Sequence, residues 1–155
     1  MDVSIRPYGE TDAGVTLSVF RSAIRVTAAA DYSQEQIEAW ASGDVDLADW
    51  HAMRAARNTV VALVDGAVVG FTDVDESGYI DMLFVDPSHG GCGVATALMD
   101  WILCDARCRG VSSLTTHASI TARSFFEAHS FVVIEERHPV IRGVVLRNYS
   151  MSRAL

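Results

Sequence analysis

The sequence predicts an α+β fold in which helices cover a sheet. Early helical patterns are followed by a run of three strands, and then by a helix, a strand, a helix and two strands. The dipeptide Asp65-Gly66 separates two apolar runs and is typical of a hairpin turn with positive φ. A strand at 79–85, a helix at 95–109 and a strand at 112–117 have the order of a βαβ crossover.

Each element has a local signal at one of its boundaries. Ser33, with Gln36 three residues later, has the spacing of a capping box and predicts the start of a helix. Pro87 ends the strand at 79–85, and Gly110 ends the helix at 95–109. In chain order, we expect a strand at 3–8, helices at 12–28, 33–41 and 46–57, strands at 59–64, 67–74 and 79–85, a helix at 95–109, a strand at 112–117, a helix from Ser119 to His129, and strands at 131–137 and 143–151.

The composition is that of a single globular domain over residues 1–155, with 50% hydrophobic and 21% charged residues. The formal net charge of -8 argues against a nucleic-acid partner, because phosphates favour a basic surface. All 12 basic residues are arginines, which excludes a Walker A lysine and a Schiff-base lysine. No signal peptide or membrane-spanning run is recognisable, so we expect a soluble cytoplasmic protein without a membrane partner.

The cysteines give no metal signal. Cys92, Cys104 and Cys108 are odd in number, which fits a reducing compartment. Cys104 and Cys108 lie four residues apart on a predicted helix, but two ligands alone do not make a zinc site. We therefore expect no metal, and we expect both side chains to pack in the buried face of the helix.

The segment between the strand at 79–85 and the next helix is rich in glycine. Gly90, Gly91 and Gly93 lie within four residues, with Cys92 among them. Backbone N–H groups of such a turn can bind an anion at the helix start, and glycine lets the ligand approach closely. A tight turn that needs positive φ is the alternative. A Rossmann fingerprint would need a third glycine here, and a Walker A loop would need a lysine.

The glycine segment resembles the acetyl-CoA loop of the GCN5-related N-acetyltransferase (GNAT) family. In that family an apolar strand is followed by four residues and then by Q/R-x-x-G-x-G/A; here Gly93 and Ala95 match, while Gly90 replaces the usual Gln or Arg. Residues 119–131, "SITARSFFEAHSF", are similar to the family helix N-x-x-A-x-x-F-Y-E-x-x-G-F. The hairpin around 65–66 has the position of the family's central hairpin, and several segments are similar to a bacterial YafP-like subgroup.

This resemblance implies a central mixed, mostly antiparallel sheet flanked by helices, with one strand that splays open at the acetyl-CoA site. It implies an N-acetyltransferase that moves an acetyl group from acetyl-CoA to an amine of a small molecule or peptide by direct attack. A homodimer is compatible with it. Gly90 and Phe126 depart from the family motifs, and they suggest the alternative of a non-catalytic CoA-binding or interaction module on the same fold.

The matched motif positions imply how the cofactor binds. The N–H of Leu83 would face the acetyl carbonyl, and Val85 would pair with the pantetheine arm. The pyrophosphate would lie on the N–H groups of 91–95, near the Thr96 hydroxyl. The expected cofactor-binding residues are Leu83, Phe84, Val85, Gly90, Gly91, Cys92, Gly93, Val94, Ala95, Thr96, Ser119 and Phe126.

Asp81 is a carboxylate in an otherwise apolar strand, and it is the catalytic candidate together with the Leu83 amide. A period of two places Tyr79, Asp81, Leu83 and Val85 on one face of the strand. Family members take bases or base–water relays from this part of the strand, which implies that Asp81 is a general base or binds the ammonium group. The alternative is a structural ion pair with an arginine such as Arg142.

The family's usual general acid is the Tyr of the F-Y pair, which is Phe126 here, and the Asn that commonly contacts the CoA arm is Ser119. Water, Tyr149 or His117 could replace the acid, or none is needed because a thiolate leaves tolerably as the anion. The substrate wall in this fold comes from the early helices and the last strands. The expected substrate-binding residues are Tyr32, Trp40, Tyr79, Arg142 and Tyr149, with ordinary packing as the alternative for each.

Overall fold

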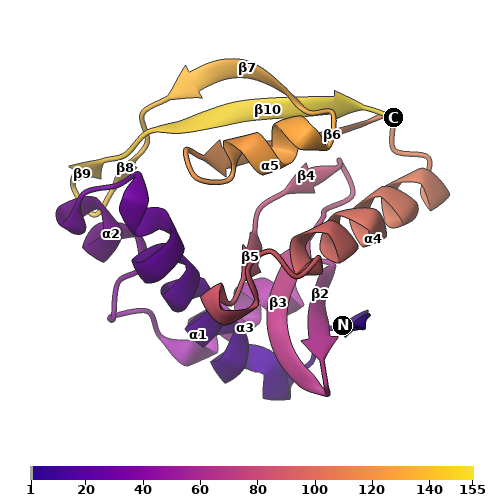
Figure 1. The fold of residues 1–155 in the computed structure, drawn as a ribbon, viewed down its shortest axis with the longest axis horizontal. Helices are drawn as coiled ribbons and strands as arrows, with labels where there is room; N and C mark the ends of the chain where they lie inside the picture. The colour runs from indigo at the N-terminus through magenta and orange to yellow at the C-terminus, as the bar shows by residue number, and fades with distance from the viewer. Residues whose placement is uncertain (1) are drawn as a thin grey trace.

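The computed structural model describes residues 2–155, whose strands form two four-stranded sheets and one short hairpin (Figure 1). The first sheet has the order β1-β2-β3-β5, with β1 at Val3–Pro7, β2 at Thr59–Val64, β3 at Ala67–Asp73 and β5 at Leu83–Val85. The second sheet has the order β4-β6-β10-β7, with β4 at Tyr79–Ile80, β6 at Ser113–Ser119, β10 at Asn148–Ala154 and β7 at Val132–Arg137. The hairpin pairs β8 at Val140–Ile141 with β9 at Val144–Val145. Only β4 and β6 are parallel among the described strands, so the predicted mixed, mostly antiparallel α+β fold is confirmed.

The helices cover the sheets from several sides. The α-helices are α1 at Ala13–Ser22, α2 at Gln34–Trp40, α3 at Leu47–Ala55, α4 at Val94–Cys108 and α5 at Arg123–Ala128. Shorter helical turns are η1 at Glu10–Asp12, the π-helical η2 at Ala23–Thr27, η3 at Ala28–Ala30 and η4 at Pro87–His89. Figure 1 shows α5 just below β10, with α1 and α2 on the left side of the view and α4 on the right side.

The hydrophobic core explains why β2 is almost continuously apolar. On one face of the first sheet, Val61 and Phe71 pack with α1 and α3. On the other face, Val60 and Ala62 pack with Leu98 of α4. Because neither face of β2 meets solvent, polar residues at alternate positions would be buried without benefit. This explains why its sequence, "TVVALV", is almost entirely apolar. A second core lies between α4, α5 and the second sheet.

The predicted strand 79–85 is divided between the two sheets. Tyr79 and Ile80 pair with β6, whereas Leu83 to Val85 pair with β3. Asp81 and Met82 lie where the chain passes from the second sheet to the first, and they belong to neither strand. This position, residues 81–82, is called the crossing point below. The segment therefore opens the sheet, as the family resemblance implied.

Several boundaries differ from the sequence-based expectations. The expected helix at Ser119 to His129 begins as α5 only at Arg123 and ends at Ala128, whereas Ser119 ends β6. The Ser119 hydroxyl nevertheless accepts a hydrogen bond from the Ala122 N–H (3.0 Å), as a capping residue does. The helix expected at 12–28 changes to a π-helical turn at Ala23. The final strand is interrupted between β9 and β10. The predicted capping box of Ser33 and Gln36 is confirmed, with N···O distances of 3.2 and 2.9 Å.

The prediction that Cys104 and Cys108 pack in the core is wrong, because both are exposed. The buried face of α4 is formed by other positions, among them Leu98, Met99 and Ile102. The two cysteines lie on the opposite side of the helix, where a small apolar side chain is tolerated at the surface.

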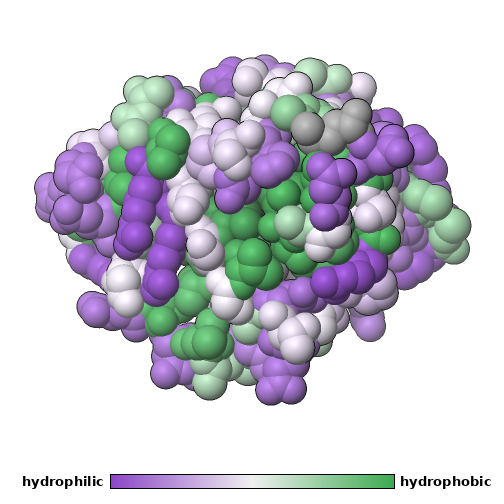
Figure 2. Space-filling model, turned by 60° about the horizontal axis from the view of Figure 1, so that its bottom comes forward, coloured by the Kyte–Doolittle hydropathy of each residue, from purple (hydrophilic) through white to green (hydrophobic). Residues whose placement is uncertain are grey.

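The face of the molecule drawn in Figure 2 is mostly hydrophilic at its rim. Figure 2 shows hydrophobic side chains gathered near the middle of one face, with hydrophilic side chains around them. Within residues 2–155, no helix combines the length and the apolar character that a bilayer crossing requires.

Candidate active site

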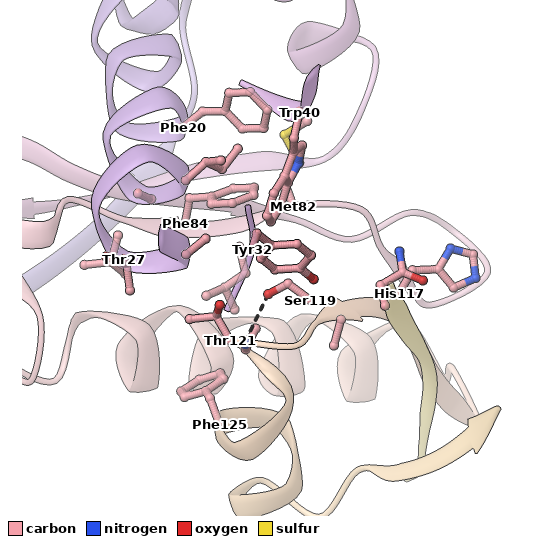
Figure 3. Close-up of a pocket in the computed structure, with 18 of the residues that line it drawn as sticks. Phe20, Thr27, Tyr32, Trp40, Met82, Phe84, His117, Ser119, Thr121 and Phe125 are labelled. Atoms are coloured by element: carbon pink, nitrogen blue, oxygen red, sulfur yellow. Dashed lines mark hydrogen bonds between the residues drawn. The ribbon is translucent and has the colours of Figure 1, made fainter. Parts of the chain in front are cut away.

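A cleft of about 570 Å³ opens where the two sheets separate. Its walls come from the α1–η3 segment, α2, the segment 81–87, the end of β6 with the start of α5, and the loops around β8 to β10. Figure 3 shows one group of mainly aromatic side chains in this cleft, consisting of Phe20, Tyr32, Trp40, Met82 and Phe84. A second group comes from the β6–α5 region and consists of Ser119, Thr121 and Phe125, while His117 lies apart from both groups.

The peptide groups of β5 alternate between β3 and the cleft. The Met82 carbonyl accepts hydrogen bonds from the Asp73 N–H (3.3 Å) and the Thr72 hydroxyl (2.7 Å), so it points toward β3. In a trans peptide the N–H lies opposite the carbonyl, and the Leu83 N–H must therefore point away from β3, toward the opening. The Asp86 N–H again points to β3, where it donates to Val69 (2.7 Å). Leu83 and Val85 thus both present their backbone groups to the cleft.

Buried polar side chains replace the strand partners that are lost at the crossing point. The Thr116 hydroxyl donates to the Ile80 carbonyl (2.9 Å), and the Asp73 carboxylate accepts from the Asp81 N–H (2.9 Å). Thr72, Asp73 and Thr116 are all buried. Because an unpaired buried peptide group is costly, these three side chains stabilise the separation of the sheets.

A charged network lies directly behind the crossing point. Arg54 is 1% exposed, and its guanidinium lies 3.3 Å from the Asp73 carboxylate and 3.5 Å from the Asp81 carboxylate. Arg57 donates to the other oxygen of Asp73 (3.1 Å). Burial raises the pKa of the Asp73 carboxyl, against the hydrogen bonds from Arg57 and the Asp81 amide, which lower it. The Asp81 side chain remains 32% exposed, so this network ends at a carboxylate that solvent can reach.

The alternative interpretation of Asp81 is an ion pair with an arginine such as Arg142. Asp81 does pair with an arginine, but that arginine is not Arg142. Arg142 lies in the β8–β9 turn, where its guanidinium donates to the Ala39 carbonyl (2.7 Å). The arginine beside Asp81 is Arg54 of α3. Asp81 lines the cleft in addition to forming this pair.

The glycine segment has the backbone geometry that only glycine adopts easily. Gly91 and Gly93 have φ values of 71° and 83°, and no atom lies within 4 Å of an added Cβ at either position. The first amide of α4 to donate to a carbonyl is Ala97, which bonds to Gly93 (3.0 Å). The N–H groups of the first helical turn therefore have no intrahelical acceptor, and the space in front of them is open.

The structure brings only part of the expected cofactor set to the cleft. The expected residues that line it are Leu83, Phe84, Val85, Gly90, Ala95, Ser119 and Phe126. Four other expected residues lie at the start of α4, beside one end of the cleft, and are exposed to solvent: Gly91, Cys92, Gly93 and Thr96. The Val94 side chain is buried in the core, so only its backbone is available. Phe126 is 3% exposed, with its ring packed against Phe125 and Phe131.

Of the expected substrate-binding residues, some line the cleft and others lie outside it. Tyr32 and Trp40 line the cleft, and their rings contact each other at a centroid distance of 5.4 Å. Tyr149 does not line it, because its side chain on β10 faces the core beside α5 and is 8% exposed. Arg142 is also outside the cleft lining. Tyr79 lies next to the cleft, where its hydroxyl is 3.3 Å from the His117 imidazole.

Several residues that line the cleft carry no signal in the sequence that marks them as site residues. Phe20 and Thr27 sit in a helical pattern that is indistinguishable from an ordinary core helix. Met82 and Phe125 are apolar neighbours of motif positions, and no sequence signal separates them from core residues. The sequence suggests His117 only as a substitute acid, although strand periodicity places it on the same face as Thr115 and Ser119.

The Tyr32 hydroxyl connects the two walls of the cleft. It donates to the Arg147 carbonyl (2.6 Å) and accepts from the Ile120 N–H (2.9 Å). Burial raises the pKa of the Tyr32 phenol, so the hydroxyl keeps its proton. A further hydrogen bond between Thr121 and Asp31 (2.7 Å) joins the same two segments. These contacts hold the η3–α2 segment against the β6–α5 turn.

Replacing Tyr32 with Phe is expected to destabilise the protein by about 1–3 kcal/mol, since a partly buried N–H and a partly buried carbonyl lose their partner. The opposite walls should also separate more easily. Chemical denaturation measures the first effect, and the KM of an acceptor amine measures the second. Tyr8→Phe is the matched control, because it removes a single hydrogen bond to His51 (2.9 Å) outside the cleft. An equal change in KM for both variants would contradict a role of Tyr32 in shaping the cleft.

No group of three or more His, Cys, Asp or Glu side chains in the described part of the chain is arranged to hold a metal ion. The polar groups that line the cleft include backbone amides and several hydroxyls, together with the side chains of Asp81, Asp86, His117, Arg147 and Asn148.

Comparisons with known proteins agree with this geometry. The model of the family "Acetyltransferase (GNAT) domain" matches residues 28–153. The chain is 36% identical over 150 residues to the uncharacterized N-acetyltransferase YafP of Escherichia coli K12, which covers 97% of this chain and 95% of YafP. Among solved structures, a GCN5-related N-acetyltransferase from Rhodopseudomonas palustris superposes with a TM-score of 0.96 at 37% identity, covering 100% of this chain and 97% of that one.

More distant structures share the fold alone. The PaiA N-acetyltransferase of Thermoplasma acidophilum, in complex with coenzyme A, has a TM-score of 0.76 at 16% identity over 100% of both chains. The acetyltransferase YncA of Salmonella typhimurium, with acetyl-CoA, has a TM-score of 0.72 at 20% identity, covering 100% of this chain and 95% of that one. The family match and the relatives at 36% and 37% identity show that the chain belongs to the GCN5-related N-acetyltransferase family and is an acetyl-CoA-dependent acetyltransferase, in agreement with its divided strand and its glycine turn.

Proposed function

We propose that the protein transfers the acetyl group of acetyl-CoA to an amine of a small molecule or peptide, and that the amine attacks the thioester directly. The orientation of the Leu83 N–H carries this proposal. Because the Met82 carbonyl is held by β3, the Leu83 N–H faces the opening, where it can donate to the acetyl oxygen. A fixed donor at this position stabilises the negative charge that develops on the oxygen during attack.

The glycine turn supplies the proposed site for the pyrophosphate. The positive φ angles of Gly91 and Gly93 turn the chain into α4, and the free N–H groups of the first helical turn favour an anion. A Cβ at either glycine would meet nothing in the protein, which leaves room for a ligand. The two distant relatives that carry coenzyme A or acetyl-CoA have the same fold, which supports this placement.

Direct attack is favoured over an acetyl-enzyme intermediate because the cleft lining contains no cysteine among the described residues. Cys92 lies in the glycine turn and is exposed, and its thiol contacts the Gly90 carbonyl at 3.6 Å. An amine bound against Asp81 would approach the acetyl carbonyl from the side of the crossing point. We propose that Asp81 takes part in holding or deprotonating this amine.

The experiment is an assay of free thiol with acetyl-CoA and four amines: phenethylamine, spermidine, and tripeptides with a free α-amine or a lysine side chain. We expect thiol release with at least one amine and the appearance of its N-acetyl derivative by mass spectrometry. Calorimetry with acetyl-CoA is run in parallel. Tight binding of acetyl-CoA without acetylation of any amine would instead support the alternative of a non-catalytic CoA-binding module.

A further inference from the structure

We propose that His117 accepts the proton of the acceptor amine, while Asp81 binds the incoming ammonium group. The inference rests on the proposed acetyl transfer. It assigns deprotonation of the amine to His117 and binding of the ammonium group to Asp81, whereas the sequence pattern suggests Asp81 for either role. The two side chains come from β6 and from the crossing point after β4, which part at the cleft.

The strand register places Asp81 and His117 beside each other. In the parallel pair of β4 and β6, Tyr79 is level with Thr115 and Ile80 with Thr116. The next level is therefore Asp81 and His117, where the strands begin to separate. Period-two alternation in β6 puts His117 on the face of Thr115, and so of its partner Tyr79, opposite the buried Leu114 and Thr116. Asp81 and His117 both line the cleft. A contact between the Tyr79 and His117 rings, with centroids 5.4 Å apart, confirms the shared face.

Charged groups on two segments act on the imidazole, and a further cation lies over the neighbouring Tyr79 ring. Asp81 follows β4, Glu135 and Arg137 come from β7, and Arg57 lies over the Tyr79 ring at 5.8 Å. Burial lowers the pKa of His117, and Arg137 lowers it further, whereas Asp81 and Glu135 raise it; the net direction is downward from 6.5. A neutral imidazole at neutral pH is able to accept a proton, which suits a general base.

Tyr79 fixes the proposed tautomer. Burial, followed by the charge of Asp81, raises the pKa of its phenol, so the hydroxyl stays protonated. We assign the tautomer in which the His117 Nδ1–H donates to the Tyr79 oxygen, because this leaves the Nε2 lone pair free for the amine proton. Tyr79 is then a positioning residue.

Asp81 is suited to hold a cation rather than to move a proton. Its amide is bound by the Asp73 carboxylate (2.9 Å), and its carboxylate lies 3.5 Å from the buried Arg54 guanidinium. Both contacts fix the side chain, and the positive charge of Arg54 stabilises its negative charge. The exposed part of the carboxylate is available to an ammonium group.

The ammonium group binds Asp81 and gives one proton to Nε2 of His117. The neutral amine attacks the acetyl carbonyl carbon, the new C–N bond forms, and the C–S bond of the thioester breaks. The CoA thiolate takes the second nitrogen proton, directly or through solvent. The products are the N-acetyl amine, CoA thiol and a His117 imidazolium, which returns its proton to solvent.

The first test needs no turnover. A pH titration of the histidine ring protons by NMR, with His117 assigned from the signal missing in His117→Gln, measures its pKa. We expect a value below 6.5 that falls further in Asp81→Asn, because the neighbouring negative charge is removed. A His117 pKa at or above 6.5 that Asp81→Asn leaves unchanged would overturn the proposed pair.

The second test compares kcat and KM as functions of pH, with the fastest amine of the four-amine panel. His117→Gln should lower kcat by roughly 10²- to 10⁴-fold, abolish the rise of kcat on the acidic side and leave acetyl-CoA affinity unchanged. Asp81→Asn should raise the KM of the amine by more than about tenfold, with the acidic rise retained. Tyr79→Phe should lower kcat less than His117→Gln does, and it should shift the pH at which kcat rises on the acidic side. His138→Gln, at a side chain that is 58% exposed, is the matched control and should behave as wild type.

Two results would contradict the assignment. A wild-type kcat and pH profile in His117→Gln would remove His117 from the reaction. Loss of the acidic rise in Asp81→Asn would make Asp81 the base. If the wild-type protein binds acetyl-CoA but acetylates none of the amines, the proposed function fails, and the NMR titration still decides whether His117 and Asp81 are coupled.

Discussion

Replacing Gly93 with proline is expected to weaken acetyl-CoA binding by well over tenfold, which corresponds to about 1.4 kcal/mol or more. Gly93 has a φ of 83°, whereas the proline ring requires a φ near -65°. The turn into α4 must therefore reorganise, and the N–H groups proposed to bind the pyrophosphate lose their direction. Calorimetric titration with acetyl-CoA measures the effect, and circular dichroism shows whether the variant is folded.

Gly90→Ala is the matched control for Gly93→Pro. Gly90 has a φ of -63°, which alanine adopts freely, and the nearest atom to an added Cβ is the Pro87 carbonyl oxygen at 3.5 Å. We expect this variant to bind acetyl-CoA nearly as well as wild type. Unchanged affinity in folded Gly93→Pro would remove the pyrophosphate from the glycine turn.

Replacing Arg54 with methionine is expected to cost about 3–5 kcal/mol of unfolding free energy, because it leaves the buried Asp73 carboxylate without one of its two guanidinium partners. The Asp81 carboxylate loses its partner as well, so acceptor binding should weaken in the protein that remains folded. Chemical denaturation at neutral pH measures the stability change.

A partly exposed ion pair at the C-terminal end of α4 provides the comparison for Arg54→Met. Arg109 and Asp105 are 31% and 22% exposed and lie one helical turn apart, with an N···O distance of 2.8 Å. Arg109→Gln is expected to cost less than about 1 kcal/mol, as solvent screens the pair. If Arg54→Met were no more destabilising than Arg109→Gln, the network behind the crossing point would not stabilise the fold.

The features that could be predicted from the sequence are those with local causes. The Asp65-Gly66 turn adopts φ values of 51° and 79° for the two residues, as that dipeptide favours. The capping box at Ser33 depends on residues three apart. The glycine motif was recognisable because positive φ angles at fixed spacing leave few other choices of residue.

The division of strand 79–85 has causes that are distant in the sequence. Its crossing point depends on Thr72 and Asp73 of β3 and on Thr116 of β6, which take the place of strand partners. Thr and Asp at the ends of apolar strands look like ordinary boundary residues. Only the family resemblance indicated that the strand would open, because no local pattern encodes a partner 36 residues away.

The substrate wall was the least predictable part of the site. Tyr149 lies on β10, between two other strands, and alternation gives two faces without telling which one meets α5. Arg54 belongs to a helix whose polar residues suggest a solvated surface, yet it is almost fully buried. The fold, rather than the sequence pattern, decides which of these side chains reaches the cleft.

The most direct test of the account is a single-turnover experiment with excess enzyme. Wild-type protein is mixed with acetyl-CoA alone or with acetyl-CoA and an acceptor amine from the panel, and both the small molecules and the intact protein are analysed by mass spectrometry over time. Direct attack in the cleft predicts the N-acetyl amine and free CoA only when both substrates are present, with no acetylated protein at any time. Release of CoA without the amine, together with an acetyl group on the protein that is later passed to the amine, would contradict the account.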